Sequence, residues 1–126
     1  MQYSYDNGFD APAPVAPIII FQAFGTPETG RQIRCLIDSG SDEVWLPENE
    51  LQNLGCLQVD QTLVEYADGG QSLRPLYYVG VRIEEHVDEA LEVIAGGNGE
   101  HALIGRRVLN RFVCELNGPD SVVEIR

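Results

Sequence analysis

One carboxylate in this chain stands where it could do chemistry. Asp38 lies at the end of an apolar run and at the start of a tight turn: residues 35–41 read Cys-Leu-Ile-Asp-Ser-Gly-Ser, and Val44, Trp45 and Leu46 follow closely. A carboxylate that is held on a rigid turn can act as a general acid or base. The chain has only one such element, so a chemistry that needs two carboxylates would need two copies of the chain.

The two residues after Asp38 suit this task. Gly40 lets the backbone turn sharply and lets another chain approach closely. The Ser39 hydroxyl can hydrogen-bond a neighbouring main-chain group and brace the turn. An Asp-Ser-Gly tripeptide is by itself also consistent with an ordinary surface turn. The apolar residues on both sides place this turn near a core, and Trp45 is expected to belong to that core, with a pocket wall as the alternative.

The composition argues against a metal site, a disulfide framework and a nucleic-acid partner. His86 and His101 are too few and too scattered for a metal cluster. The three cysteines are widely spaced and odd in number, which disfavours a disulfide framework and a zinc site. The formal net charge of −12 argues against a nucleic-acid partner. The same charge makes two copies repel each other at neutral pH, and protonation of carboxylates would relieve that repulsion.

The remainder of the chain alternates short apolar runs with turn residues, which predicts an all-β barrel or sandwich with one or two brief helices. An Asp-Gly pair at 68–69 predicts a hairpin whose two central residues both adopt positive φ. A helical turn is expected over 47–54 and a short helix over 106–111. The expected strands are Ile18–Phe24, Gln32–Asp38, Leu57–Tyr66, Leu73–Ile83, Leu91–Ala95, Phe112–Leu116 and Val122–Ile125.

The chain is expected to form one domain over residues 18–126, preceded by a flexible Pro-rich leader over residues 1–17. No apolar run is long enough to cross a bilayer, so no membrane partner is expected. The first residues lack the basic start and long apolar stretch of a signal peptide. The expected location is therefore cytoplasmic.

Two motifs together resemble a known family. Ile-Asp-Ser-Gly-Ser at 37–41 looks like the active-site motif of aspartic peptidases, and Leu-Ile-Gly-Arg at 103–106, followed by Val108 and Leu109, resembles their second hallmark. Their order and spacing are similar to the single-domain, retropepsin-like branch, which comprises retroviral proteases and bacterial relatives. The resemblance implies a closed β-barrel with one short C-terminal helix. It also implies a homodimer that hydrolyses peptide bonds and uses neither metal nor organic cofactor.

The resemblance also assigns roles to residues. Asp38 would be catalytic and would face Asp38 of a second copy, with Ser39 and Gly40 supporting the pair. Asp42 and Arg106 stand where the family has a paired aspartate and arginine, which predicts an ion pair beside the site. Two separate solvated charges are the alternative for these residues.

The hairpin at Asp68, Gly69 and Gly70 corresponds in place to the flap, the mobile hairpin that covers substrate in this family. An ordinary hairpin is equally consistent with these residues, and the glycine-rich loop at 96–99 is a second flap candidate. The chain lacks the Gly-Gly-Ile-Gly-Gly flap signature of the retroviral enzymes. Arg107 also departs from the family, which prefers Asp or Asn there, so a hydrogen bond within the helix is expected to be missing or replaced.

The terminal segments leave the construction of the dimer open. Retroviral dimers interleave N- and C-terminal strands, whereas here 122–125 could pair with 112–116 through the Asn-Gly turn. The sequence thus favours an aspartic endopeptidase that prefers acidic pH. A catalytically inactive dimerisation or peptide-binding module and a generic β-barrel are the alternatives.

Overall fold

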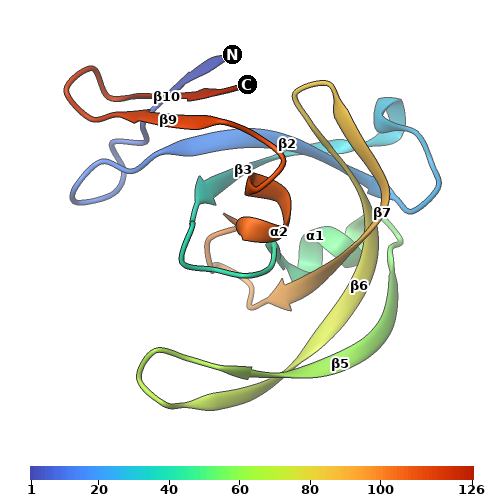
Figure 1. Ribbon diagram of the computed structural model, residues 1–126. Helices are drawn as coiled ribbons and strands as arrows, with labels where there is room; N and C mark the ends of the chain where they lie inside the picture. Colours follow the sequence, from blue (N-terminus) through green and yellow to red (C-terminus); the bar gives the residue numbers. More distant parts are fainter.

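The computed structural model describes all residues, 1–126, and consists mostly of β-strands. Strands account for 52% of the residues, which confirms the predicted all-β class. Figure 1 shows the strands wound around one core, with a long hairpin extending from it. The elements in chain order are β1 Gln2–Ser4, β2 Val15–Gln22, a 3₁₀ turn Pro27–Thr29, β3 Arg31–Ile37, β4 Trp45–Pro47, α1 Glu48–Asn53, β5 Leu57–Glu65, β6 Gln71–Ile83, β7 His86–Gly96, β8 Leu103–Ile104, α2 Arg106–Leu109, β9 Cys114–Asn117 and β10 Val122–Ile125.

The main sheet closes on itself. Its strand order is β2-β3-β8-β4-β7-β6-β5, and β2 also pairs with β6, so β5 is the one strand attached outside the ring. Most neighbours are antiparallel, but β3 runs parallel to β8 and β4 runs parallel to β7. A closed ring leaves few unpaired strand edges, which stabilises a small β-domain against association through those edges. This closure confirms the predicted barrel.

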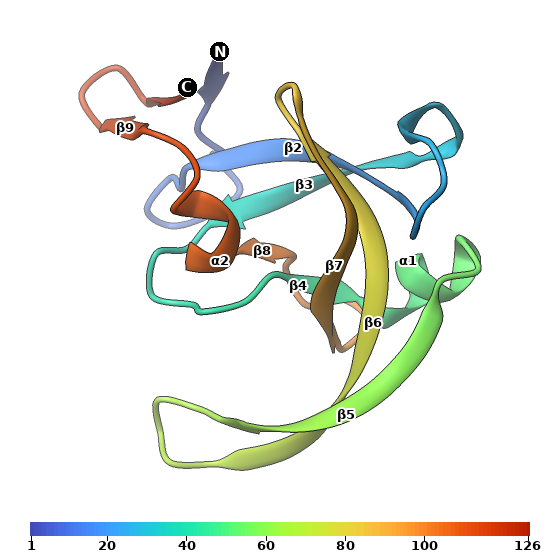
Figure 2. The same cartoon turned by 45° about the vertical axis from the view of Figure 1, so that its right-hand side comes forward.

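Alternating side chains fill the inside of the ring. On β6 the buried side chains are Tyr77, Val79, Val81 and Ile83, as the alternation in the sequence predicts. They belong to one cluster of 20 buried residues to which β2, β7 and α2 also contribute. The core is therefore continuous from the barrel to α2, which lies beside β8 (Figure 2).

The first residues differ from the expected flexible leader. Gln2–Ser4 form β1, which pairs antiparallel with β10, and β2 begins at Val15 rather than at residue 18. β10 pairs in turn with β9, so the predicted contact between the last two strands is confirmed. These three strands form a second small sheet whose order is β1-β10-β9. Backbone hydrogen bonds to β10 order the first residues, and such long-range pairing leaves no signal in local composition.

The β5–β6 hairpin spans the expected residues but turns differently than expected. Gly69 alone has a positive φ, of 86°, and its N–H donates to the carbonyl of Tyr66 at 2.9 Å. The Tyr66 N–H donates to the carbonyl of Gly70 at 2.8 Å, and the Gly70 N–H donates to Oδ1 of Asp68 at 2.8 Å. The connection is thus a three-residue loop rather than the predicted two-residue turn.

The short helices lie near the predicted places. α2 ends at Leu109 instead of residue 111, and α1 forms within the helical turn expected over 47–54. None of the helices has the length and apolar character needed to cross a lipid bilayer.

Candidate active site

Asp38 follows directly on β3, at a point where the chain leaves the barrel. Its N–H donates to the carbonyl of Ile104 on β8 at 3.0 Å, which anchors the start of the loop to the neighbouring strand. Its carboxylate Oδ1 accepts the Gly40 N–H at 2.9 Å, and its carbonyl accepts the Ser41 N–H at 3.2 Å. These three bonds fix the main chain and one carboxylate oxygen, and leave the other oxygen free to act on a ligand.

The N-terminal end of α2 holds the rest of this loop. The Arg106 N–H donates to the carbonyl of Ser41 at 2.8 Å, and the Arg107 N–H donates to the carbonyl of Asp42 at 3.0 Å. The first amides of a helix have no partner within the helix, so this loop satisfies them. Gly105 permits the close approach, because a Cβ there would lie 2.1 Å from the carbonyl oxygen of Glu43.

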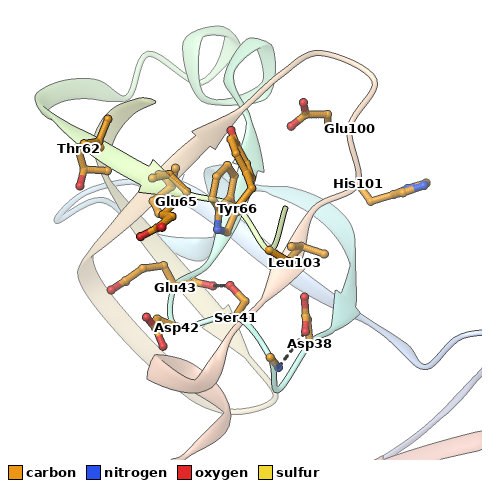
Figure 3. A pocket seen from close by; sticks show the side chains of 16 residues that line it. Asp38, Ser41, Asp42, Glu43, Thr62, Glu65, Tyr66, Glu100, His101 and Leu103 are labelled. Carbon is orange, nitrogen blue, oxygen red and sulfur yellow. Dashed lines mark hydrogen bonds between the residues drawn. The ribbon is translucent and has the colours of Figure 1, made fainter. Parts of the chain in front are cut away.

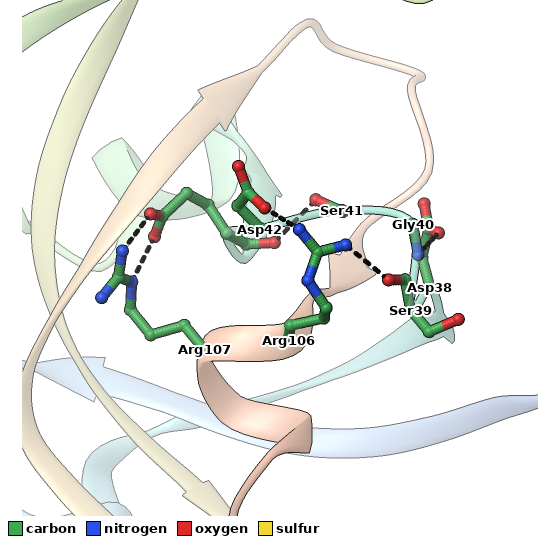
Figure 4. A network of polar contacts seen from close by, with 8 residues as sticks. Asp38, Ser39, Gly40, Ser41, Asp42, Arg106 and Arg107 are labelled. Atoms are coloured by element: carbon green, nitrogen blue, oxygen red, sulfur yellow. Dashed lines mark hydrogen bonds and ion pairs between the residues drawn. The ribbon is translucent and has the colours of Figure 1, made fainter.

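Two arginine side chains add to this attachment (Figure 4). Arg106 forms the predicted ion pair with Asp42 and also donates to the carbonyl of Ser39 at 2.7 Å. Arg107 binds both carboxylate oxygens of Glu43, at 2.8 and 2.6 Å. The Glu43 carboxylate raises the pKa of the Arg107 guanidinium, first through hydrogen bonding and then through its charge. Where the family prefers Asp or Asn, this chain thus has a two-point ion pair.

Within one chain, the serine hydroxyl that braces the loop is that of Ser41. The Ser41 hydroxyl donates to the carbonyl of Glu43 at 3.0 Å. Ser39 is exposed, and within this chain it is held by its carbonyl rather than by its hydroxyl. Because Ser39 and Ser41 are only two residues apart, composition alone does not distinguish which hydroxyl lies toward the loop.

A cleft of about 790 Å³ opens beside Asp38. One wall is the loop after β3, and the facing wall is the β5–β6 hairpin. Figure 3 shows Glu65 and Tyr66 of the hairpin on one side, and Asp38, Ser41 and Asp42 on the other. The lining residues are Asp38, Gly40, Ser41, Asp42, Glu43, Trp45, Thr62, Leu63, Val64, Glu65, Tyr66, Ala67, Ile94, Glu100, His101 and Leu103.

The predicted site residues gather only in part at this cleft. Asp38, Gly40 and Asp42 line it, and Arg106 lies beside it through its contacts with the loop. Asp68, Gly69 and Gly70 form the tip of the hairpin and do not line the cleft. The wall is made by the residues just before them, 62–67, which the glycine signal of the turn does not indicate.

Several lining residues carry no motif in the sequence. Trp45 lines the cleft and is only half-buried, so it is a cleft wall more than the core residue expected. Glu100 and His101 reach the cleft from the loop after β7, and the His101 ring packs on Phe9 with ring centroids 4.6 Å apart. For Trp45 the structure thus favours the pocket wall, which the sequence offered as the alternative to a core position.

No protein-family model and no curated protein matches the chain, but solved structures share its fold. A retropepsin-like aspartic protease from Rickettsia conorii superposes with a TM-score of 0.68, covering 99% of this chain and 89% of that one, at 15% identity. EIAV protease in complex with the inhibitor HBY-793 gives a TM-score of 0.59 over 79% and 86% of the two chains, also at 15% identity. Simian foamy virus (mac) protease gives a TM-score of 0.50, covering 75% of this chain and 92% of that one, at 18% identity. The chain therefore has a retropepsin-like fold, which confirms the fold predicted from its motifs.

Proposed function

We propose that the chain is an aspartic endopeptidase that acts as a homodimer, with one Asp38 contributed by each copy. The observation that carries this proposal is the setting of Asp38. Its carboxylate lies in a cleft, on a loop fixed by main-chain hydrogen bonds, at the end of a strand in a fold shared with aspartic proteases. A rigidly held carboxylate beside a space of this size suits attack on a bound polymer.

The chemistry follows from bringing two carboxylates together. Two carboxylates about 3 Å apart cannot both ionise easily and share one proton, for which aspartic proteases are themselves the standard example. The ionised Asp38 accepts a proton from a water molecule, which attacks the peptide carbonyl. The protonated Asp38 donates to the carbonyl oxygen, and a proton then passes to the leaving amine. Water is the nucleophile, so Ser39 forms no acyl-enzyme.

A second copy completes the site because one chain supplies only one aspartate on an Asp-Ser-Gly turn. Ser39 and Gly40 are exposed at the turn, where a symmetry-related turn could approach. The net charge of −12 opposes this approach at neutral pH, and protonation of carboxylates weakens the repulsion. Dimerisation and the shared proton therefore both favour activity below neutral pH.

The β5–β6 hairpin is proposed as the flap. Leu63 and Leu73 are opposite each other on its two strands, and their side chains are 61% and 59% exposed. An apolar pair this exposed, one member of which lines the cleft, suits contact with a substrate that binds as an extended strand. The loop that carries Glu100 also borders the cleft and ranks second as a flap.

Substitution of Asp38 tests the proposal. A peptide library is incubated with the wild-type chain, with Asp38→Asn and with the control Glu89→Gln, which removes an exposed carboxylate outside the cleft. We expect cleavage by the wild type and by the control, inhibition by a pepstatin-type compound, and a loss of about 10³-fold or more in Asp38→Asn. Cleavage that survives in Asp38→Asn would contradict the proposal.

Sedimentation at pH 5 and pH 7.5 tests the dimer. We expect the dimer fraction to be larger at pH 5, and Asp38→Asn to fold and dimerise like the wild type. A stable dimer without any cleavage would favour the peptide-binding module over the peptidase.

A further inference from the structure

We propose that Arg107 is a positioning residue of this cleft: by binding Glu43 it holds and neutralises the wall that follows Asp38. The inference deepens the proposed peptidase function and rests on it for its kinetic test. It concerns the position at which this chain departs from the family motif.

The contact between the two side chains has a defined geometry. Nε of Arg107 donates to Oε2 of Glu43 at 2.8 Å, and Nη2 donates to Oε1 at 2.6 Å. Two parallel bonds between planar groups fix both distance and orientation, which a lysine could not do. The Glu43 side chain is 26% exposed, so the pair is partly shielded from solvent.

The main chain of Arg107 reinforces the same contact. Its N–H donates to the carbonyl of Asp42 at 3.0 Å, next to the residue that its side chain binds. Arg107 thus binds two consecutive residues of the loop. Arg106 forms hydrogen bonds to Ser39 and Ser41 and an ion pair with Asp42. The first turn of α2 thus contacts four residues of the loop between Asp38 and β4, which are Ser39, Ser41, Asp42 and Glu43.

The pair also determines the charge of the cleft. Five carboxylates line the cleft, and His101 is its one titratable base; the five are Asp38, Asp42, Glu43, Glu65 and Glu100. Arg106 pairs with Asp42 and Arg107 pairs with Glu43, so two of the five are neutralised from outside the cleft. Loss of Arg107 would release the negative charge of Glu43 into the cleft, which would attract cationic substrate side chains.

The fluorescence of Trp45 provides a measurement that does not depend on peptide cleavage. It is the only tryptophan of the chain, it lines the same cleft, and it lies two residues after Glu43. Quenching of its fluorescence by acrylamide therefore reports on the position of this wall.

The experiment compares Arg107→Gln, Arg107→Lys, Glu43→Gln and the double variant with the control Arg31→Gln. Arg31 pairs with Glu50 at 2.8 Å outside the cleft, and its side chain is 56% exposed, as is that of Arg107. Two peptides that differ only by Lys or Gln at one position serve as substrates. We expect Arg107→Gln to shift the ratio of kcat/KM about threefold toward the Lys peptide and to change Trp45 quenching.

The other variants separate charge from position. Arg107→Lys keeps the charge but not the two-point contact, so it should restore the ratio while leaving quenching altered. Glu43→Gln and the double variant should show no shift toward the Lys peptide, and Arg31→Gln should match the wild type in both measurements. If Arg107→Gln does not fold, Arg107→Lys and Glu43→Gln still decide between these outcomes.

The inference is overturned if Arg107→Gln and Arg31→Gln give the same ratio and the same quenching. A wild-type chain that cleaves no member of the peptide library overturns the proposed function instead. Quenching alone then decides the inference: a change in Arg107→Gln but not in Arg31→Gln supports it, and no change in either overturns it.

Discussion

Replacing Gly105 by alanine tests how tightly α2 and the Asp38 loop are packed together. The backbone of Gly105 is extended, with φ −94° and ψ −176°, so alanine can adopt it without torsional strain. A Cβ at this position would lie 2.1 Å from the carbonyl oxygen of Glu43 and 2.7 Å from that of Ser41. Both neighbours are main-chain atoms, so neither can rotate away, and the effect of the substitution is purely steric.

The size of the effect follows from this overlap. Ordinary contacts of a Cβ begin at 3.4 Å, so the loop must move by about 1 Å or more to admit the methyl group. Overpacking of this kind costs about 1–3 kcal/mol. Moving the loop also weakens the amide bonds from Arg106 and Arg107 to the loop carbonyls, at about 1 kcal/mol each. The expected loss in the free energy of unfolding is therefore about 3–5 kcal/mol, or roughly 10–15 °C in Tm.

Urea and thermal unfolding followed by Trp45 fluorescence measure this loss. Gly118→Ala is the matched control, because a Cβ there meets no atom within 4 Å and its φ is not in the left-handed range. The peptide cleavage rate of Gly105→Ala, relative to the wild type, should be well below the fraction of Gly105→Ala molecules that are folded. The reason is that the loop that carries Asp38 has moved in the folded molecules. If Gly105→Ala is no less stable than Gly118→Ala, the tight contact between α2 and the loop is refuted.

Two predictions concern ionisation in the folded chain. Burial raises the pKa of Cys35 to about 12, so native protein at pH 8 should leave Cys35 unmodified by iodoacetamide until it is unfolded, as peptide mapping would show; rapid native modification would contradict its burial. Burial, followed by the 2.7 Å hydrogen bond to Glu84, raises the pKa of Tyr3 to about 12 from 10.0. The folded chain then retains a proton that the unfolded chain loses, so the stability is complete below pH 10 and falls between pH 10 and about 12. Tyr3→Phe should reduce the dependence of the free energy of unfolding on pH between pH 10 and about 12, as measured by urea unfolding. An unchanged pH dependence would contradict the assignment.

Much of the fold follows from local pattern. The alternation of apolar residues along β6 is enough to predict a half-buried strand, because successive side chains point to opposite faces. The apolar alternation of residues 33–37 likewise predicts a strand, and this strand ends at Asp38. The pairing of Arg106 with Asp42 comes from the motif resemblance rather than from any pattern within the chain.

Two features that the sequence does not predict depend on partners distant in the chain. β1 is a strand because β10 lies beside it, and Glu43 is neutralised because Arg107, 64 residues later, reaches it. The turn at 66–70 differs from the prediction for another reason: an Asp-Gly pair is compatible with both two- and three-residue loops, and the strand register decides between them. Trp45 lines a cleft because the hairpin stands away from it.

The path of the loop that carries Asp38 is fixed in large part by hydrogen bonds of main-chain groups. The carbonyls of Ser41, Asp42 and Ile104 take part whatever side chains those positions have. Substitutions can therefore accumulate around the loop while its path is preserved, provided that Gly105 keeps its place. A scaffold of this kind can drift far in sequence and still present an acid at the same point in space.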